Sequence, residues 1–430
     1  MSFKPEQKLH QTLSSFKSLA SPPSEPKHPI HDDEFVPACQ FVTQLVMQSN
    51  QYGTSLVRLH DFMSHLPQLF GFYGVMLSAS PFFFFEFWRP DDPHSKRMIV
   101  RQLAGSFDLA KLSAVGVLVN EMADGKVSFA DGSARLKEID SNPLRYRESI
   151  VAAGYALCGA GFAVLLSVAW RDVGFAALLS LVVYVITVTA DRSQWLANRL
   201  NLTAALAASL LANLLAVVFP GSNASVVALC AVIVLVPGLS LTLGTAELAS
   251  KLTIPGINRL VDGILVTFAL VVGVAVGSAA VRTLWSISAP AAAATRPLWI
   301  TLPSVIALML GLALVFQVRR RDIGWVILAG GLAYLGVQIG DRFGDWAGAF
   351  LGALFLGIYA TLYTLRLRRP GSVVLLPGIM ILVPGVAAYF GLNTLQENGI
   401  FGALPAVWGV VVQITAIIGG LFVAASVLPQ

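Results

Sequence analysis

From Ile150 onward, the chain is a series of apolar blocks separated by short polar stretches. Ten such blocks can be counted, and each is close to the roughly 20 residues that a helix needs to cross a bilayer. They lie at residues 150–169, 173–190, 200–219, 225–246, 263–281, 298–318, 323–340, 346–365, 373–392 and 402–428. The pattern predicts an α-helical polytopic membrane protein with ten transmembrane helices.

The part of the chain before these blocks holds most of the Lys, Asp and Glu residues and all six His. Residues 1–35 are rich in Pro, Ser and charge, which predicts a disordered tail. Apolar residues at three- and four-residue steps predict one amphipathic helix over residues 36–68. The stretch 74–88, GVMLSASPFFFFEFW, predicts paired strands, and 108–125 predicts a helix that ends at a glycine. We therefore expect a small cytoplasmic α+β domain at residues 36–148.

The loops between the blocks predict the orientation, because cytoplasmic loops are richer in Lys and Arg. With the N-terminal domain in the cytoplasm, ten Lys and Arg fall in inside loops and four in outside loops. The inside residues are Arg192, Arg199, Lys251, Arg259, Arg319, Arg320, Arg321, Arg366, Arg368 and Arg369, and the outside ones are Arg171, Arg282, Arg296 and Arg342. Both termini are therefore expected on the cytoplasmic side.

Four motifs recur along the apolar part at a nearly constant offset. Three recur 150 positions later and the fourth 147 positions later. The matched segments are 170–174 with 320–324, 190–192 with 340–342, 220–222 with 370–372, and Leu235-Val236-Pro237-Gly238 with Leu382-Val383-Pro384-Gly385. Each repeat holds five spans, an odd number, so the second copy enters the membrane from the opposite side. We expect two inverted five-helix repeats, at residues 149–290 and 291–430.

Each repeat carries a proline and a glycine inside an apolar block, at Pro237-Gly238 and Pro384-Gly385. Proline removes a backbone hydrogen bond and glycine loosens the next turn, so both helices are predicted to be broken. Broken helices in secondary transporters meet near the midplane and expose backbone dipoles to the substrate. The alternative is an ordinary kink, since proline and glycine are tolerated in spanning helices.

Polar side chains near the first break are candidates for the substrate pathway. Ser240, Thr242 and Thr245 follow the break and suit a hydroxyl and a carboxylate, or else bond back to the carbonyls of their own helix. Asn213, alone in the third span, either faces the pathway or makes an interhelical hydrogen bond. Glu247 is a candidate proton carrier, unless it lies in the cytoplasmic interface.

Two acid–base dipeptides occupy matching positions at the ends of the second and seventh spans. Asp191 and Arg192 recur as Asp341 and Arg342. Ion pairs there would close an inner and an outer gate, and the alternative is that these residues are interfacial anchors.

Composition agrees with lipid surroundings and excludes several classes of protein. Hydrophobic residues make up 56% of the chain and charged residues 12%, whereas soluble domains average about 25% charged residues. The net charge of +5 is not gathered in a stripe, so no nucleic acid is expected. Cys39, Cys158 and Cys230 form neither a disulfide framework nor a metal cluster. Phosphate-binding loops and hydrolase motifs are missing, so neither an enzyme nor a cofactor is expected.

Several segments resemble the threonine/serine exporter family, over about residues 36–428. They are LVPGLSLTLGTAEL with IPGINRLVDGIL, the second LLPGIMILVPG, and SFDLAKLSAVGVLVNEMADGKVS before the membrane part. The resemblance implies a ten-span exporter of a bacterial inner membrane, driven by the proton gradient and acting on threonine, serine or related small metabolites. Some relatives are associated with succinate export.

The sequence thus predicts a secondary transporter that exports threonine or serine by proton antiport. Its expected partners are a small-molecule substrate, protons and the lipid bilayer. A homo-oligomer is compatible with the sequence. An exporter of a small dicarboxylate such as succinate and a passive channel for small metabolites are the alternatives. A membrane-anchored enzyme with its chemistry in residues 36–145 is the remaining rival.

Overall fold

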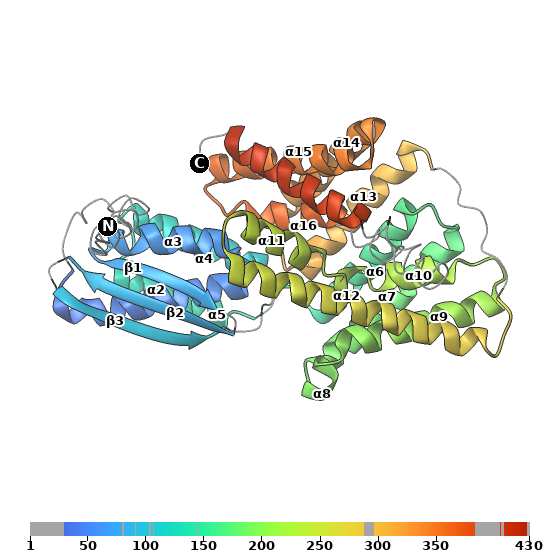
Figure 1. The fold of residues 1–430 in the computed structure, drawn as a ribbon, viewed down its shortest axis with the longest axis horizontal. Coiled ribbons are helices and arrows are strands. Elements are labelled where there is room, and N and C mark those ends of the chain that lie inside the picture. Colours follow the sequence, from blue (N-terminus) through green and yellow to red (C-terminus); the bar gives the residue numbers. More distant parts are fainter. Residues whose placement is uncertain are drawn as a thin grey trace, which may run out of the picture.

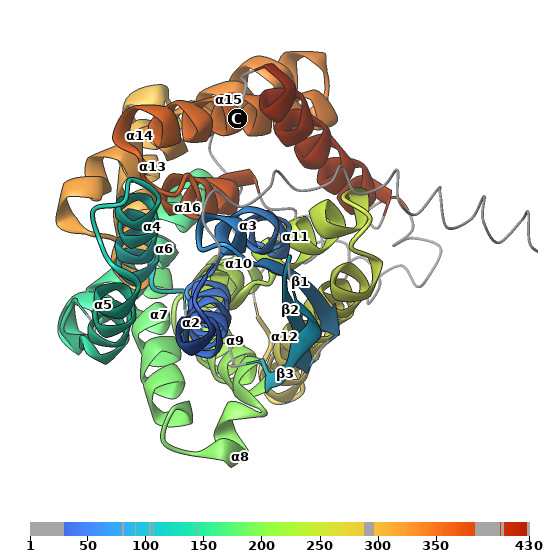
Figure 2. The ribbon, with the colours of Figure 1, turned by 90° about the vertical axis from the view of Figure 1, so that its left-hand side faces the viewer.

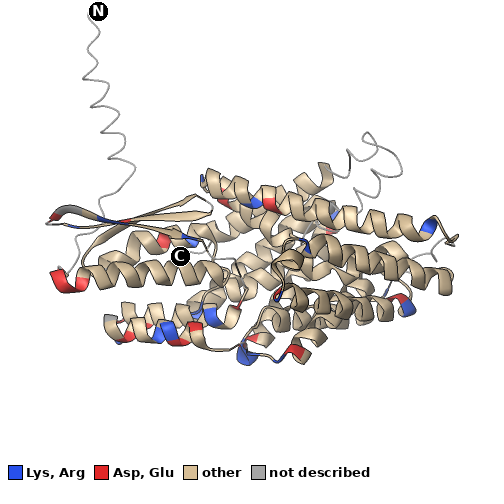
Figure 3. Cartoon of the chain, turned by 90° about the horizontal axis from the view of Figure 1, so that it is seen from below, with Lys and Arg blue, Asp and Glu red and all other residues tan. Residues whose placement is uncertain are grey.

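The structure is a computed structural model. It describes residues 30–287 and 296–427, except positions 80, 91, 103, 104, 106, 144, 383–404, 406 and 407. A three-stranded sheet and four helices gather at one end of the molecule, and long apolar helices fill the other (Figure 1). Acidic and basic residues lie mainly in the first part and near the ends of the apolar helices (Figure 3).

The N-terminal part is an antiparallel meander, β1-β2-β3, packed with helices. Its elements are α2 (Asp32–Gln51), α3 (Leu56–Leu69), β1 (Tyr73–Ala79), β2 (Phe82–Arg89), β3 (Asp92–Arg101), α4 (Leu109–Ala123) and α5 (Phe129–Ser141). The run of phenylalanines in β2 follows the period of two that a strand requires. Phe83, Phe85 and Phe87 are buried in the core, whereas Phe82 and Phe84 are exposed on the other face.

The predicted paired strands and the helix ending at a glycine are confirmed, but the single helix over residues 36–68 is wrong. Two helices occupy this stretch, and α2 begins at Asp32, inside the segment predicted as a tail. The chain turns at Gly53, whose φ of +107° favours glycine. Tyr52 is buried before this turn and donates a hydrogen bond to Asp140 (2.6 Å). The periodicity missed the break because both helices present apolar residues to one core.

Eight helices in the described part are long and apolar enough to cross a membrane, as expected of a polytopic membrane protein. They are α6 (Glu148–Leu165), α7 (Trp170–Ala190), α9 (Leu200–Val218), α12 (Thr253–Arg282), α13 (Leu298–Val315), α14 (Ile323–Gly340) with its flanking turns, α15 (Asp345–Leu367) and the helix Trp408–Val427. The fourth predicted block is a bent pair, α10 (Ala224–Ala231) and a segment ending in α11 (Gly238–Ala249), and it makes nine if counted as one span.

Two predicted blocks differ from the helices observed. The ninth begins as the shorter apolar helix α16 (Ser372–Leu382), and the rest of that block lies outside the described residues. The fifth block is predicted at 263–281, but α12 starts earlier, at Thr253. Pro255 fits the first turn of a helix, and the helix includes the polar residues that precede the apolar block.

Helices α6 and α13 cross in opposite directions and touch through small residues. The Cys158 Sγ lies 3.9 Å from the Leu308 carbonyl oxygen. A Cβ atom on Gly154 would stand 3.0 Å from the Gly311 carbonyl oxygen, and one on Gly311 would stand 2.7 Å from that of Gly154. Small residues at this crossing allow the two backbones to approach closely.

Two buried aspartates hold the segments that lead into α10 and α16. Asp172 accepts hydrogen bonds from the Ser222 hydroxyl and from the Asn223 backbone N–H (3.1 Å), just before α10. Asp322, 150 positions later, pairs with Arg369 just before α16. Corresponding residues of the two halves therefore have corresponding structural roles.

The N-terminal part docks onto one end of the helical part. The Leu109 N–H donates to the Phe316 carbonyl oxygen (3.0 Å), and Arg58 donates to the Ser372 hydroxyl (3.2 Å). Figure 2, which looks at the molecule from that end, shows α3 close to α11 and α16. Helix α3 of the N-terminal part therefore lies next to the ends of α11 and α16.

Candidate functional site

The break in the fourth span begins where regular hydrogen bonding stops. Helix α10 ends at Ala231, a short 3-10 turn covers Ile233–Leu235, and α11 begins at Gly238. The two parts are bent by 56°. The first N–H groups of α11 have no partner within their own helix, so its positive end is directed into the bundle.

The space beside this break is closed. Pro237 and its neighbours line a cavity of only about 10 Å³, together with Thr267 and Leu270 of α12. That volume is at the lower limit for one water molecule. This cavity, as the described residues line it, is therefore too small for a metabolite such as an amino acid.

The three polar residues after the break point in different directions. The Thr245 hydroxyl donates to the Leu241 carbonyl oxygen (2.7 Å), which is the back-bonding alternative. Thr242 is 1% exposed, and its hydroxyl has no hydrogen-bond partner in the described structure. Ser240 lines a much larger cavity at the end of the helical part.

This larger cavity lies between the N-terminal part and helices α11 and α12, and has a volume of about 670 Å³. A volume of this size is typical of small-molecule sites. Its polar lining includes Thr54, Arg101, Ser240, Asn258, Arg259 and Asp262. Both signs of charge are therefore present, as a zwitterion requires.

Glu247 lies behind this cavity and is 1% exposed. Its carboxylate is 3.2 Å from the Arg259 guanidinium, which also lines the cavity. The backbone N–H of Leu56, at the start of α3, lies near the same carboxylate. Glu247 is thus buried where α11, α12 and the N-terminal part meet, and its proton-carrying role stays a prediction.

The remaining candidate from the first half, Asn213, is 2% exposed and bonds within its own helix. Its amide donates to the Ser209 carbonyl oxygen (2.8 Å), and the Ser209 hydroxyl continues to the Val274 carbonyl oxygen of α12 (2.8 Å). The Asn213 Oδ1 atom is buried without a hydrogen-bond partner in the described structure. The hydrogen bond from this helix to α12 is therefore made by Ser209, and the role of Asn213 in the pathway stays a prediction.

The proposed gate residues lie on the surface. Asp191 and Arg192 are exposed at the end of α7, and Asp341 and Arg342 are exposed after α14. Their gating role stays a prediction. Pro384 and Gly385 lie outside the described residues.

Arg101, Asn258 and Asp262 were not among the candidate site residues predicted from the sequence, although all three line the cavity. The spacing of two of these residues could have indicated them, because in a helix whose first turn contains Pro255, Asn258 and Asp262 lie one turn apart on one face. Arg101 carried no such signal, since it reaches the cavity from the end of β3 through the docking of the N-terminal part.

Two models of threonine/serine exporter families match the chain, one over residues 41–281 and another, "Threonine/Serine exporter, ThrE", over residues 301–427. A "Probable threonine/serine exporter" from Mycobacterium tuberculosis is 25% identical over 344 residues, which cover 74% of this chain and 63% of that protein. "Pheromone-regulated membrane protein 10" from Yarrowia lipolytica is 24% identical over 397 residues, covering 87% of this chain and 32% of that protein. The chain thus spans less than two thirds of either relative, and no solved structure matches it.

Proposed function

Because the chain belongs to the threonine/serine exporter family, which is a family of membrane transporters and not of enzymes, we propose that it exports threonine, serine or a similarly small amino acid by proton antiport. The observation that carries this proposal is the cavity of about 670 Å³ between the N-terminal part and helices α11 and α12. It holds Arg259 for a carboxylate, Asp262 for an ammonium group and the hydroxyls of Ser240 and Thr54 for a polar side chain.

The proposed architecture has ten spans in two inverted repeats, at residues 149–290 and 291–430. The crossing of α6 and α13 supports it. At an offset of 150, Gly161 corresponds to Gly311 and Gly154 to Ser304. Gly154 packs against Gly311, and Gly161 packs against Ser304, so the contact is self-complementary. Antiparallel, reciprocal contacts are those that a two-fold axis between inverted copies would produce.

The same proposal places residues 36–148 in the cytoplasm as a separate domain, with residues 1–35 as a tail and the helices in a bacterial inner membrane. The cavity between this domain and α11 is then the cytoplasmic entrance. Substrate entering it at Ser240 would be two residues away from the break at Pro237 and Gly238. Thr242, which is buried next to this route and has no hydrogen-bond partner among the described residues, would offer its hydroxyl there.

Antiport requires that substrate and proton bind alternately, and the Glu247–Arg259 pair provides a way. A zwitterion moving up from the cavity would replace the pair, with its carboxylate on Arg259 and its ammonium group on ionised Glu247. Protonated Glu247 could not hold an ammonium group, because it carries no charge. Substrate and proton would therefore compete for one carboxylate.

The test uses the purified full chain in liposomes with an imposed pH gradient and labelled threonine, serine and succinate. We expect gradient-driven movement of threonine or serine that is lost in Glu247→Gln. Glu148→Gln is the matched control, because Glu148 is an exposed carboxylate at the start of α6. Movement of succinate alone would assign a dicarboxylate exporter, and movement that only equilibrates the substrate would assign a channel. Equal transport by the Glu247 variant would remove this residue from the coupling.

A further inference from the structure

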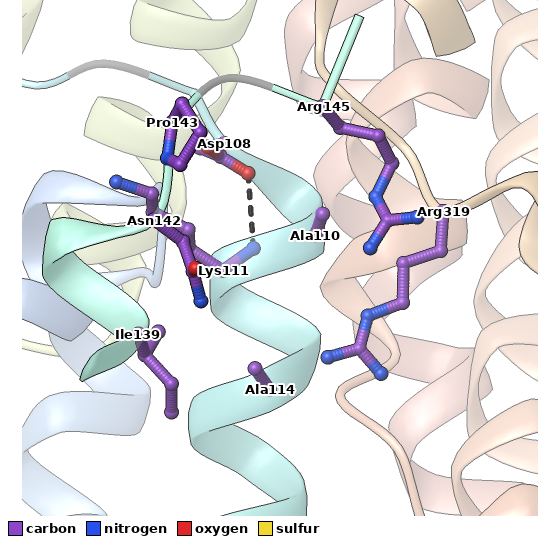
Figure 4. A pocket seen from close by; sticks show the side chains of 9 residues that line it. All are labelled: Asp108, Ala110, Lys111, Ala114, Ile139, Asn142, Pro143, Arg145 and Arg319. Carbon is purple, nitrogen blue, oxygen red and sulfur yellow. Dashed lines mark hydrogen bonds between the residues drawn. The ribbon is translucent and has the colours of Figure 1, made fainter. Parts of the chain in front are cut away.

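A second pocket lies on the other side of the domain junction, away from the proposed substrate route. It has a volume of about 420 Å³ and is bounded by α4, the end of α5 and the segments that contain Arg145 and Arg319 (Figure 4). Arg145 directly precedes the first span, and Arg319 follows α13. The pocket is therefore at the boundary between the apolar helices and the N-terminal domain.

The two arginines are held side by side although they carry like charges. Between them, the Tyr146 N–H donates to the Gln317 side-chain oxygen (3.0 Å), and the Tyr146 hydroxyl donates to the Val318 carbonyl oxygen (2.7 Å). All three of these residues are buried. These two buried hydrogen bonds hold the backbone next to Arg145 against the backbone next to Arg319.

Neither guanidinium forms an ion pair with any residue that the structure describes. The Arg319 Nε is also buried without a hydrogen-bond partner there. Burial lowers the pKa of Arg319, and the neighbouring Arg321 guanidinium lowers it further, while Asp322 acts in the opposite direction. A buried cationic donor without a partner is unfavourable unless an anion completes the site.

Two carboxylates lie near the arginines, and each has another partner in the described structure, although the buried Asp322 Oδ2 atom has none there. Asp108 lines the same pocket and caps α4 by accepting from the Lys111 N–H (2.9 Å), at the start of the helix in Figure 4. Asp322 pairs with Arg369. The Lys111 ammonium group donates to the Asp140 carbonyl oxygen (2.8 Å) and keeps its positive charge at the other end of the pocket.

The wall of α4 opposite the arginines carries only small side chains. Ala110 and Ala114 are one turn apart, and both guanidinium groups point toward that side of the helix (Figure 4). The space is larger than a carboxylate needs. Guanidinium groups bind phosphate oxygens in pairs, with a geometry that an ammonium group cannot reproduce.

We propose that Arg145 and Arg319 form a binding site for a phosphate group, carried by an anionic lipid headgroup or by a free phosphate compound, that ties the N-terminal domain to the second half of the membrane part. The bound phosphate would neutralise the two guanidinium groups and bridge the start of α6 to the end of α13. Neither the substrate cavity nor the Glu247–Arg259 pair takes part, so the site stands apart from the proposed transport function.

The experiment measures thermal stability of the purified full chain in two arms. In neutral detergent, inorganic phosphate is titrated against chloride at equal ionic strength. In nanodiscs, phosphatidylcholine is compared with a mixture of phosphatidylcholine and phosphatidylglycerol. Arg145→Gln is the first variant, because Arg145 is exposed and its loss leaves the fold intact. Arg319→Gln is the second, and Arg145→Lys keeps the charge while removing the paired donors.

We expect wild type to be stabilised in one arm, with the apparent affinity falling about tenfold or more in each Gln variant and by less in Arg145→Lys. Stabilisation by phosphate identifies a free compound, and stabilisation only by phosphatidylglycerol identifies a lipid headgroup. Arg366→Gln is the matched control, since Arg366 is exposed at the end of α15, outside the pocket. A response equal in wild type and Arg145→Gln, an equal loss in Arg366→Gln, or no response in either arm would overturn the site.

Discussion

The ion pair between Glu247 and Arg259 offers a quantitative test of the junction. The two residues differ in access to water, because the side chain of Glu247 is 1% exposed and that of Arg259 23%. Arg259→Met would leave a buried carboxylate without its cation, which costs about 3–5 kcal/mol in unfolding free energy. Glu247→Gln would leave a guanidinium that still reaches the cavity, with a smaller loss of about 1–3 kcal/mol.

The double variant decides whether the two residues act as a pair. Removing both charges restores most of the stability lost in Arg259→Met, because no unpaired buried charge remains. Thermal unfolding of the full chain in detergent, followed by the loss of its monodisperse size-exclusion peak, ranks the four proteins. The exposed pair Arg97–Glu86 is the control, and its removal changes the midpoint little. If the two losses simply add in the double variant, the pair does not stabilise the junction and the reasoning fails.

Three further predictions concern packing, a hydrogen bond and a thiol. Gly311→Ala places a methyl group 2.7 Å from the Gly154 carbonyl oxygen of the facing helix and lowers the free energy of unfolding by roughly 1–3 kcal/mol. Gly331→Ala, which would meet no described atom within 4 Å, does not lower it. Equal unfolding midpoints of the two variants would contradict the close crossing of α6 and α13. Tyr146→Phe leaves the buried Val318 carbonyl oxygen unpaired and costs about 1–3 kcal/mol, and an unchanged midpoint would show that water replaces the hydroxyl. Burial raises the pKa of the Cys39 thiol to about 12. Iodoacetamide at mildly alkaline pH is therefore expected to modify this thiol only after unfolding. Labelling of the native chain at the rate of a free thiol would contradict this burial.

Features set by local periodicity could be predicted from the sequence. The run of phenylalanines alternates in β2 as a strand should, and the break at Pro237 and Gly238 lies where the apolar block contains both helix-weakening residues. The prediction failed at Gly53, where one amphipathic pattern runs across two helices. Apolar spacing reports the side that a segment buries, and two helices that share a core can present the same spacing.

The candidate site was predictable only in part. Thr242 and Glu247 are polar residues that follow the break within an apolar block, and this position in the sequence marked them as candidates. Their partners did not follow, because Arg259 meets Glu247 through the packing of α12 on α11, and Arg101 arrives from β3. No spacing rule connects residues that meet only when two elements dock.

The sequence by itself determined the membrane class and the position of the first break, since hydropathy and the Pro-Gly pair act locally on the segment that contains them. Tertiary structure decided which charges meet. It joined Glu247 to Arg259 at the junction and held Arg145 beside Arg319. Side chains from distant segments interact only at contact distance, and that distance is set by how helices and domain pack against one another.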